Sequence, residues 1–477
     1  NAVPQGRAIV LSSDVFDDDG FSLKVTGDRL EVKGGRGAGV LFGVYELLET
    51  YGGCGWFSAD SVDIPRLSAF LVPEGLDDRQ KPAFCLRSTS WSPVIGSSSV
   101  VHAARCRLNG SRNTGGEARF GGSNPYRFDK VLDNCHTFRL LVPVKRYFKE
   151  HPEYFSEVGG RRVEKNTQLC LTNPDVLAIV ISNVLMRIRA NPSCRYFGVS
   201  QNDWQNPCCC ASCKAIDDRE GSHAGTVITF VNKVAEAVEK EFPNVVIETL
   251  AYQYSRKPPK TVRPRHNVMP CLCSFECDFS KPFGVSRYKE NIAFERDILR
   301  WHEISPRLYV WDYTVNFKNY THAFPNVETI GPNIRFFRDA GVSHLFEQGC
   351  GQAPHADFAE LKAWLIGKFA WNPDRSLEPL LDRFFSGYYG PAAKVVREVH
   401  EAIYSCNRKR DERTYSLGIY EGVGSDWLSD GFYERIGEMW DRAFELVKDK
   451  VNVMLPYLTY LSDLVTKILE LFGSFFG

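Results

Sequence analysis

The sequence predicts an α/β protein centred on a (β/α)8 TIM barrel, and three observations lead to it. Eight short apolar runs alternate with helical patterns in the middle of the chain. Four of these runs end abruptly in a carboxylate, and the stretches before and after the runs show different patterns. We therefore expect a small α/β domain over residues 1–80, the barrel over 81–372, and a C-terminal helical domain over 373–477.

The first 80 residues show the pattern of a small sheet covered by a helix. Residues 21–25 and 29–33 alternate apolar and polar side chains on either side of Thr26-Gly27-Asp28. This spacing predicts two paired strands joined by a tight turn. The apolar residues 40–48 that follow predict a helix that packs on them.

Eight strands are expected in the barrel. Their predicted ranges are 84–87, 138–142, 168–171, 196–199, 245–250, 268–273, 308–311 and 343–346. Asn173 before Pro174 predicts the capped start of a helix that runs to about residue 190. A stripe of Val and Phe over 227–238, and Ile292 with Leu299, predict further helices. Pro270 does not suit a central strand and suggests a bulge.

The chain after residue 373 shows helical periodicity. Helices are predicted over residues 380–385, 392–404, 433–447 and 458–471, and no strand-like run appears there.

Composition excludes some function classes and leaves others open. With 58 basic and 58 acidic residues among 477, the net charge is zero, so no basic excess points to nucleic acid. No apolar run is long enough for a membrane span. The 15 cysteines are odd in number and scattered, which argues against a fully paired disulfide framework. Aromatic residues make up 13%, consistent with a large core or with platforms that stack on sugars.

The carboxylates at the strand ends are the main candidates for chemistry. They are Asp203, Glu276, Asp312 and Glu347, after the fourth, sixth, seventh and eighth predicted strands. Barrel active sites form at the carboxyl ends of the strands, so these four should converge there. Cleavage of a glycosidic bond needs two such groups. The plainer alternative is that each is a solvated loop carboxylate.

Several neighbouring residues are candidates for substrate binding. Asn202 lies beside Asp203, and the aromatic residues Trp204, Trp311 and Tyr313 could wall a sugar site or belong to the rim of the core. His136 is a candidate hydrogen-bonding residue, with a buried structural histidine as the alternative. Arg87 could bind an acidic sugar through a bidentate contact, or form an ordinary ion pair with a barrel carboxylate.

A cysteine cluster follows Asp203. Cys210 and Cys213 have the C-x-x-C spacing of a zinc or redox pair, and Cys208 could add a ligand. No second pair follows to complete a finger-like site. We therefore expect a disulfide or packed thiols that shape the loop, with a structural metal on Cys208, Cys210 and Cys213 as the alternative.

The chain also resembles known families. Residues 39–49 with Gly55-Trp56-Phe57-Ser58 resemble the N-terminal domain that precedes the barrel in α-glucuronidases and β-hexosaminidases. Residues 367–374, Gly-Lys-Phe-Ala-Trp-Asn-Pro-Asp, resemble a stretch after the α-glucuronidase barrel, and the centre is similar to a bacterial family of uncharacterised barrels. The resemblance implies a glycoside-hydrolase-like barrel, and a secreted or periplasmic location. Hexosaminidases carry an Asp-Glu pair where this chain has Asn202-Asp203.

Hydrolysis of a glycosidic bond in a polysaccharide or glycan is the function we expect. Asp203 would be the general acid, Asp312 or Glu347 would activate water, and Glu276 would orient the sugar. This mechanism requires no metal or organic cofactor; its partner is a carbohydrate. The rival is a carbohydrate-binding barrel without catalysis. A metal-dependent hydrolase that uses the cysteine cluster is a third hypothesis.

Overall fold

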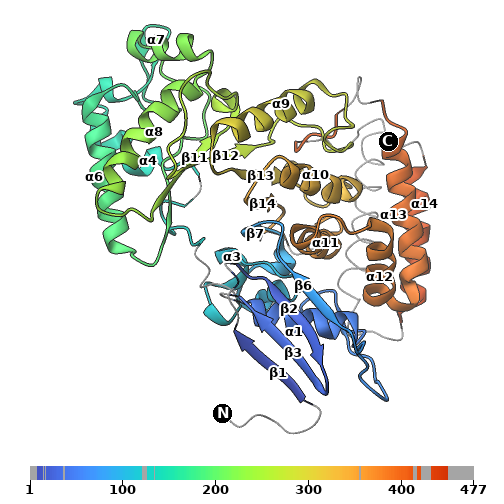
Figure 1. Cartoon of the computed structure of the whole chain (residues 1–477). Coiled ribbons are helices and arrows are strands. Elements are labelled where there is room, and N and C mark those ends of the chain that lie inside the picture. The colour runs from blue at the N-terminus through green and yellow to red at the C-terminus, as the bar shows by residue number, and fades with distance from the viewer. Residues whose placement is uncertain are drawn as a thin grey trace.

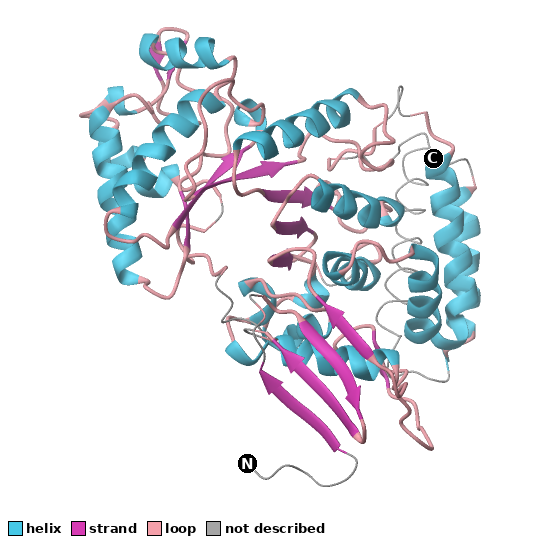
Figure 2. Ribbon diagram, viewed as in Figure 1, coloured by secondary structure: helices cyan, strands magenta, loops and turns pink. Residues whose placement is uncertain are grey.

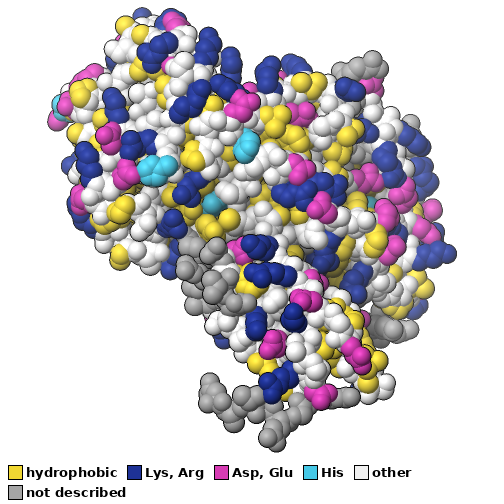
Figure 3. All heavy atoms as spheres, viewed as in Figure 1, with side chains coloured by type: hydrophobic (Ala, Val, Ile, Leu, Met, Phe, Trp, Pro, Cys, Tyr) yellow, Lys and Arg dark blue, Asp and Glu magenta, His cyan; other side chains and the backbone are white. Residues whose placement is uncertain are grey.

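A computed structural model shows an α/β protein with a curled parallel sheet at its centre (Figures 1 and 2). It describes residues 8–13, 16, 18–35, 38–120, 126–133, 135–353, 356–411, 416–420 and 431–448. The predicted helix over 458–471 lies outside these residues. On the face shown in Figure 3, basic and acidic side chains are interspersed, in keeping with the zero net charge.

The central sheet has six parallel strands in the order β10-β11-β12-β13-β14-β7. They are β7 (Leu86–Thr89), β10 (Tyr196–Gly198), β11 (Val246–Ala251), β12 (Val268–Cys273), β13 (Tyr309–Tyr313) and β14 (His344–Gln348). All six match strands predicted from apolar runs. Because β7 pairs with β14, the first strand of the sheet in sequence lies beside the last, and the sheet curls into a half barrel.

The second and third predicted strands are wrong. Residues 138–142 form the short helix α4 (Phe138–Leu141), and residues 168–171 make one isolated bridge, between Phe155 and Leu169. The chain that lies against the free edge of β10 is instead the irregular segment 127–132, which bridges at Phe128 and donates Asp129 N to Tyr196 O. Asn109 N donates to Arg87 O at the free edge of β7. These contacts cover both edges without completing further strands.

Helices cover the outer face of the half barrel. They are α6 (Pro174–Ala190), α8 (Ala224–Glu239), α9 (Lys289–Ile304), α10 (Val327–Asp339) and α11 (Ala359–Trp371), while α7 (Ala211–Glu220) packs on α8 away from the sheet (Figure 1). Asn173 caps α6 as predicted, since its side chain accepts from the backbone N–H groups of Asp175 and Val176. The stripe expected on α9 is wrong: Ile292 and Leu299 are exposed, and Phe294, Ile298 and Trp301 are the buried face.

Pro270 sits in β12 without a bulge. The register between β11 and β12 runs unbroken from Ile247↔Val268 to Ala251↔Leu272, with Thr249 opposite Pro270. On the other side, β12 pairs with β13 only from Cys271 onward. Pro270 therefore lies just before the pairing between β12 and β13 begins. At this position its missing N–H removes no hydrogen bond between strands.

An N-terminal sheet packs below the half barrel. Its strands are β1 (Ala8–Ser13), β2 (Phe21–Thr26), β3 (Arg29–Gly34) and β6 (Asp77–Gln80), in the order β1-β3-β2-β6. The helix α1 (Gly39–Thr50) covers one face. Trp371, at the end of α11, stacks on Phe21 at 5.6 Å between ring centroids and meets Phe42 edge-on, so the two sheets share part of one core.

Three helices form the right-hand side of Figure 1. They are α12 (Leu377–Tyr389), α13 (Ala393–Arg408) and α14 (Phe432–Glu445). They correspond to three of the four helices predicted for this region. After α13, the segment 416–420 returns to the sheet, where Leu417 N donates to Asp278 and Phe317 N donates to Ile419 O. No helix among the described residues has the length and apolar character needed to cross a bilayer.

Candidate active site

A cavity of about 310 Å³ lies at the carboxyl ends of the parallel strands. Its size is at the lower end of what small-molecule sites show, about 300–1,000 Å³. Strands β11 to β14 and the loops after them supply most of the wall. The lining residues are Cys135, His136, Asp203, Leu250, Tyr252, Cys273, Phe275, Trp311, Tyr313, Phe317, Gln348 and Tyr420.

Aromatic rings make up half of this lining. Phe275 meets Tyr252 edge-on at 5.2 Å and Tyr313 at 5.9 Å, and Tyr420 lies 6.0 Å away. Trp311 is fixed by a 2.6 Å hydrogen bond from its Nε1 to Gln348 Oε1. A wall of oriented rings offers flat apolar faces beside polar tips, which is the surface that a sugar ring needs. Trp311 and Tyr313 therefore line the cavity, and their contact with a sugar stays a prediction.

Asp203 supplies the carboxylate of the cavity. It follows β10, and its Oδ1 accepts a 3.1 Å hydrogen bond from the hydroxyl of Tyr252. His136 Nε2 lies 3.9 Å from the same oxygen. Because His136 Nδ1 is 3.0 Å from the carbonyl of Gln201, which can only accept, Nδ1 carries the hydrogen in neutral His136. The Asp203 side chain is 59% exposed, so it can reach a bound ligand.

The structure does not place Asn202 and Trp204, the neighbours of Asp203, at the predicted substrate-binding positions. Asn202 is buried: its Oδ1 accepts from Arg139 N, and its Nδ2 donates to Thr167 O. Its side chain holds the loop together instead of facing the cavity. Trp204 is 46% exposed and is not part of the lining. Neither residue lines the cavity, so the prediction that they contact a sugar there is wrong.

The predicted convergence of four carboxylates is wrong. Successive residues of a strand point to opposite faces. Trp311 and Tyr313 line the cavity, so Asp312 between them points to the helices, where the Ser274 hydroxyl donates to it. Glu347 is the register partner of Asp312 and points the same way. Both carboxyls are buried, and neither lines the cavity.

Burial changes the protonation of these two carboxyls. Loss of water raises the pKa of Asp312 to about 7, and burial together with the charge of Asp312 holds the pKa of Glu347 well above its usual range. Neither oxygen of Glu347 has a hydrogen-bond partner among the described residues. The pair is therefore a buried acidic cluster on the outer face of the sheet.

Glu276 lies next to the cavity but is held by a cation. It follows Phe275 of the lining, and its Oε2 accepts from Arg256 Nη1 at 2.9 Å. Arg256 also contacts Asp297 at 3.1 Å and Glu290 at 3.5 Å. Burial raises the pKa of Glu276, although the Arg256 charge opposes the shift. Of the three other predicted carboxylates, Glu276 is the one beside the cavity.

Arg87 is a structural residue. It is fully buried on β7, on the face away from the cavity, and its Nη2 donates to Asp19 Oδ2 at 2.7 Å. Its other nitrogens donate to the carbonyls of Phe84 and Arg107. The ion pair that the sequence offered as the plainer alternative is present, although its acid comes from the N-terminal region and not from the barrel.

Some residues of the site were not predicted. Tyr252 directly follows β11, and Tyr420 comes from a segment more than 70 residues beyond the last barrel strand in sequence. Glu248 does not line the cavity; it is buried in the middle of β11 and accepts from Ser200 Oγ at 3.1 Å, and burial raises its pKa well above the usual value. A charged residue inside an apolar run was the signal for Glu248. Nothing local marks Tyr420.

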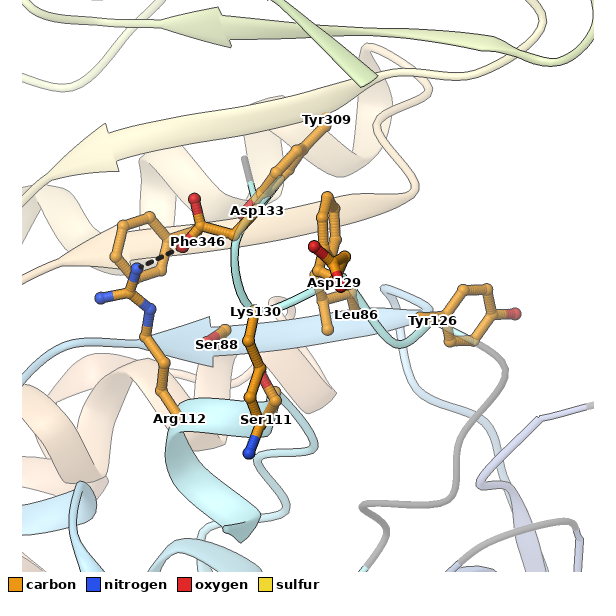
Figure 4. Close-up of a pocket in the computed structure, with 12 residues that line it drawn as sticks. Leu86, Ser88, Ser111, Arg112, Tyr126, Asp129, Lys130, Asp133, Tyr309 and Phe346 are labelled. Atoms are coloured by element: carbon orange, nitrogen blue, oxygen red, sulfur yellow. Dashed lines mark hydrogen bonds and ion pairs between the residues drawn. The ribbon is translucent and has the colours of Figure 1, made fainter. Parts of the chain in front are cut away.

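A second cavity, of about 250 Å³, lies along the seam of the half barrel. Figure 4 shows Leu86 and Ser88 of β7 beside Phe346 of the neighbouring strand β14 and Tyr309 of β13, with Lys130 and Asp133 from the segment that runs beside β10. Arg112 forms an ion pair with Asp133 at 3.4 Å. This space exists because the edges of the sheet are not joined by strands.

The cysteines after Asp203 form a compact cluster with a fourth member. The sulfur atoms of Cys170, Cys208, Cys210 and Cys213 all lie within 4.8 Å of one another, and all four residues are buried. Cys170 comes from the segment that was predicted as a strand. The described cysteines of this cluster form no disulfide. They lie outside the cavity lining, as expected for a structural role.

The fold of this chain is similar to that of solved glycoside hydrolases. A GH115 4-O-methyl-α-glucuronidase with specificity for decorated arabinogalactans aligns with TM-score 0.51 and 12% identity over 91% of this chain and 59% of its own. A GH89 enzyme from Clostridium perfringens aligns with TM-score 0.54 and 11% identity over 92% and 56%. The chain thus spans less than two thirds of these neighbours, and the likeness shows the fold.

The chain belongs to the family DUF4838, a domain of unknown function whose model matches residues 56–401. A search of curated proteins finds no match in sequence.

Proposed function

We propose that this protein binds a carbohydrate in the aromatic cavity and hydrolyses a glycosidic bond there, with Asp203 as the general acid. The observation that carries the proposal is the position of Asp203, which lines the cavity beside six aromatic rings and within hydrogen-bond distance of Tyr252. The glycoside hydrolase fold of the structural neighbours supports it.

Glu276 is the candidate for the second carboxyl group. It neighbours Phe275 of the lining, and its charge acts on Tyr252, whose hydroxyl donates to Asp203. Release from Arg256 would free its carboxylate to activate water. Asp312 and Glu347 are no longer part of the mechanism, because they lie on the opposite face of their strands.

The lining favours a neutral sugar. Among the described residues that line the cavity there is no Lys or Arg, and Arg87 is committed to Asp19. A uronic acid would therefore meet only His136 as a cationic partner. A hexosaminidase-like or another neutral-sugar activity fits this lining better than an α-glucuronidase-like one. A secreted or periplasmic location remains part of the proposal, and cell fractionation tests it.

The first test is turnover. The purified chain is assayed against aryl hexosides, N-acetylhexosaminides and glucuronides, and against natural glycans, together with Asp203→Asn and the exposed control Asp218→Asn. Asp203→Asn should lose about 10²–10⁴-fold in rate and recover part of it on substrates with good leaving groups. Asp218→Asn should match the wild type. Equal turnover of Asp203→Asn and wild type would refute the role of Asp203.

The second test is binding, and it addresses the rival function. A carbohydrate-binding barrel without catalysis is favoured by one observation: Asp203 is the single carboxylate among the described lining residues. Tyr420→Ala should weaken sugar binding about 2- to 13-fold, which corresponds to one aromatic contact of about 0.5–1.5 kcal/mol. Trp204→Ala, which removes another exposed aromatic side chain that lies outside the lining, should leave sugar binding unchanged. Binding without turnover across the whole panel would establish the rival.

A further inference from the structure

The spacing of the four sulfur atoms matches a tetrahedral metal site. Zinc–sulfur bonds of about 2.3 Å place the corners of a tetrahedron about 3.8 Å apart. The Cys170 and Cys210 sulfur atoms are 3.7 Å apart, and all four lie within 4.8 Å of one another. Disulfide sulfurs are about 2.05 Å apart, so this pair is not close to bonding. The sulfur–sulfur distances are therefore close to the edge of such a tetrahedron.

The chain delivers the four thiols from two segments. Cys170 precedes α6, and the other three surround the start of α7: Cys208 and Cys210 lie just before the helix, and Cys213 lies in its first turn. The positive end of the helix dipole favours thiolates at this position. The spacing C-x-C-x-x-C supplies three ligands. Cys170 supplies the fourth, in place of a second C-x-x-C pair.

Hydrogen-bond donors surround the sulfur atoms. Arg162 Nη1 lies 3.6 Å from Cys208 Sγ, and the backbone N–H of Glu157 donates to the same sulfur at 3.4 Å. The hydroxyl of Thr172 lies 3.3 Å from Cys213 Sγ. Arg162 is half-buried and also donates to the carbonyl of Phe155, so one cationic side chain, one backbone N–H and one hydroxyl face the sulfur atoms. They stabilise the negative charge of thiolates that bind a metal.

We propose that Cys170, Cys208, Cys210 and Cys213 bind one Zn²⁺ as a closed structural site. On binding, each thiol releases its proton to solvent, four Zn–S bonds form, and no electron is transferred. Four protein ligands leave no position for water, so the metal takes no part in hydrolysis. This separates the site from a metal-dependent hydrolase, and the metal proposal does not rest on the proposed glycosidase activity.

The site would position the loop that carries Asp203. Gln168, two residues before Cys170, donates from Nε2 to the carbonyls of Asn202 at 2.8 Å and Trp204 at 2.6 Å. Its Oε1 accepts from Asn202 N at 2.8 Å. Cys208 continues the same loop on the other side of Asp203. The metal therefore clamps both ends of a loop that has little regular structure of its own.

Metal analysis of the full chain tests the proposal. Wild type purified from zinc-supplemented medium should contain about one zinc per chain, and X-ray absorption should show four sulfur neighbours at about 2.3 Å. Cys170→Ser and Cys213→Ser should each lower the zinc content roughly tenfold or more and lower the melting temperature. Cys209→Ser is the matched control, because Cys209 lies in the same run but is exposed. It should keep both values.

Three outcomes would overturn the site. They are wild type without bound metal, iron in place of zinc, and a zinc content in Cys170→Ser equal to that of wild type. The absorption measurement uses only the wild type, so the proposal can be judged even if the Ser variants do not fold. A wild-type protein that contains zinc but hydrolyses no glycoside would count against the glycosidase proposal and not against the metal site.

Discussion

At the scale of single residues, the orientation of a side chain on its strand decides its chemistry. Trp311 and Asp312 are adjacent, yet the ring lines the cavity and the carboxyl is buried among helices. In that surrounding the charged form of Asp312 is disfavoured, and its pKa rises from 3.8 to about 7. Asp203 differs because it stands on a loop, where water and ligand can reach it.

The raised pKa of Asp312 predicts a pH-dependent stability. The folded state binds the proton more tightly than the unfolded state, so this contribution is complete below about pH 4 and is lost as the pH rises through about 7. Asp312→Asn stays neutral and keeps the acceptor for Ser274. Relative to wild type, the variant should gain stability with rising pH, on the order of a few kcal/mol by pH 8.

Urea unfolding at pH 5, 6, 7 and 8 measures this difference. Asp60→Asn, at an exposed position, is the control and should show no such trend. A constant difference between Asp312→Asn and wild type across this range would show that Asp312 is ionised in the folded protein.

At the scale of elements, close packing sets where the half barrel ends. The irregular segment 127–133 runs against β10, and Gly198 N donates to Leu132 O. A Cβ at Gly198 would lie 1.9 Å from the backbone oxygen of Asp133 and 3.2 Å from Glu248 Oε2. Only glycine allows this segment to take the edge of the sheet.

Gly198→Ala should therefore loosen the seam. The contact is with backbone, so relaxation is costly, and we expect a loss of about 1–3 kcal/mol or more in the free energy of unfolding. Gly75→Ala is the matched control, because a Cβ there meets nothing within 4 Å; its stability should be unchanged or slightly raised. Hydrogen exchange should show faster exchange in residues 127–133 of Gly198→Ala. Equal stability of the two variants would contradict this account of the seam.

At the scale of the whole molecule, buried polar contacts tie distant parts of the chain to the half barrel. Arg87 of β7 and Asp19 of the N-terminal region form a fully buried ion pair, and Asn109 Nδ2 donates to the same carboxylate at 2.8 Å. Lys368 of α11 reaches Glu49 of α1 at 2.7 Å. The C-terminal region contributes Tyr420 to the cavity. The arrangement of the cavity lining thus depends on contacts between regions that are distant in sequence.

Removal of one partner of the buried pair should destabilise the whole chain. Asp19→Ala leaves the Arg87 guanidinium uncompensated in the core, at an expected cost of about 3–5 kcal/mol. The double variant Asp19→Ala/Arg87→Met should recover part of this loss. The control Asp218→Ala breaks an exposed pair with Lys214 and should cost less than about 1 kcal/mol. If Asp19→Ala were as stable as Asp218→Ala, the buried pair would make no net contribution to stability.

The sequence by itself determined the class of the fold and the existence of most elements. Apolar runs of strand length located all six strands of the half barrel, and the Asn173-Pro174 cap located the start of α6. These features are local, because hydrophobic periodicity and capping depend on residues a few positions apart. The strands predicted at 138–142 and 168–171 are wrong, because a short apolar run fits a buried helix or loop as well as a strand.

Only the tertiary structure decided which residues share a site. A parallel sheet is buried on both faces, so nothing in the sequence tells which residues of β13 and β14 face the cavity, and Asp312 and Glu347 were assigned to the wrong face. Cys170 and Tyr420 reach their clusters through loops that close over 38 residues or more. Such contacts depend on the path of the backbone in space, which local periodicity does not encode.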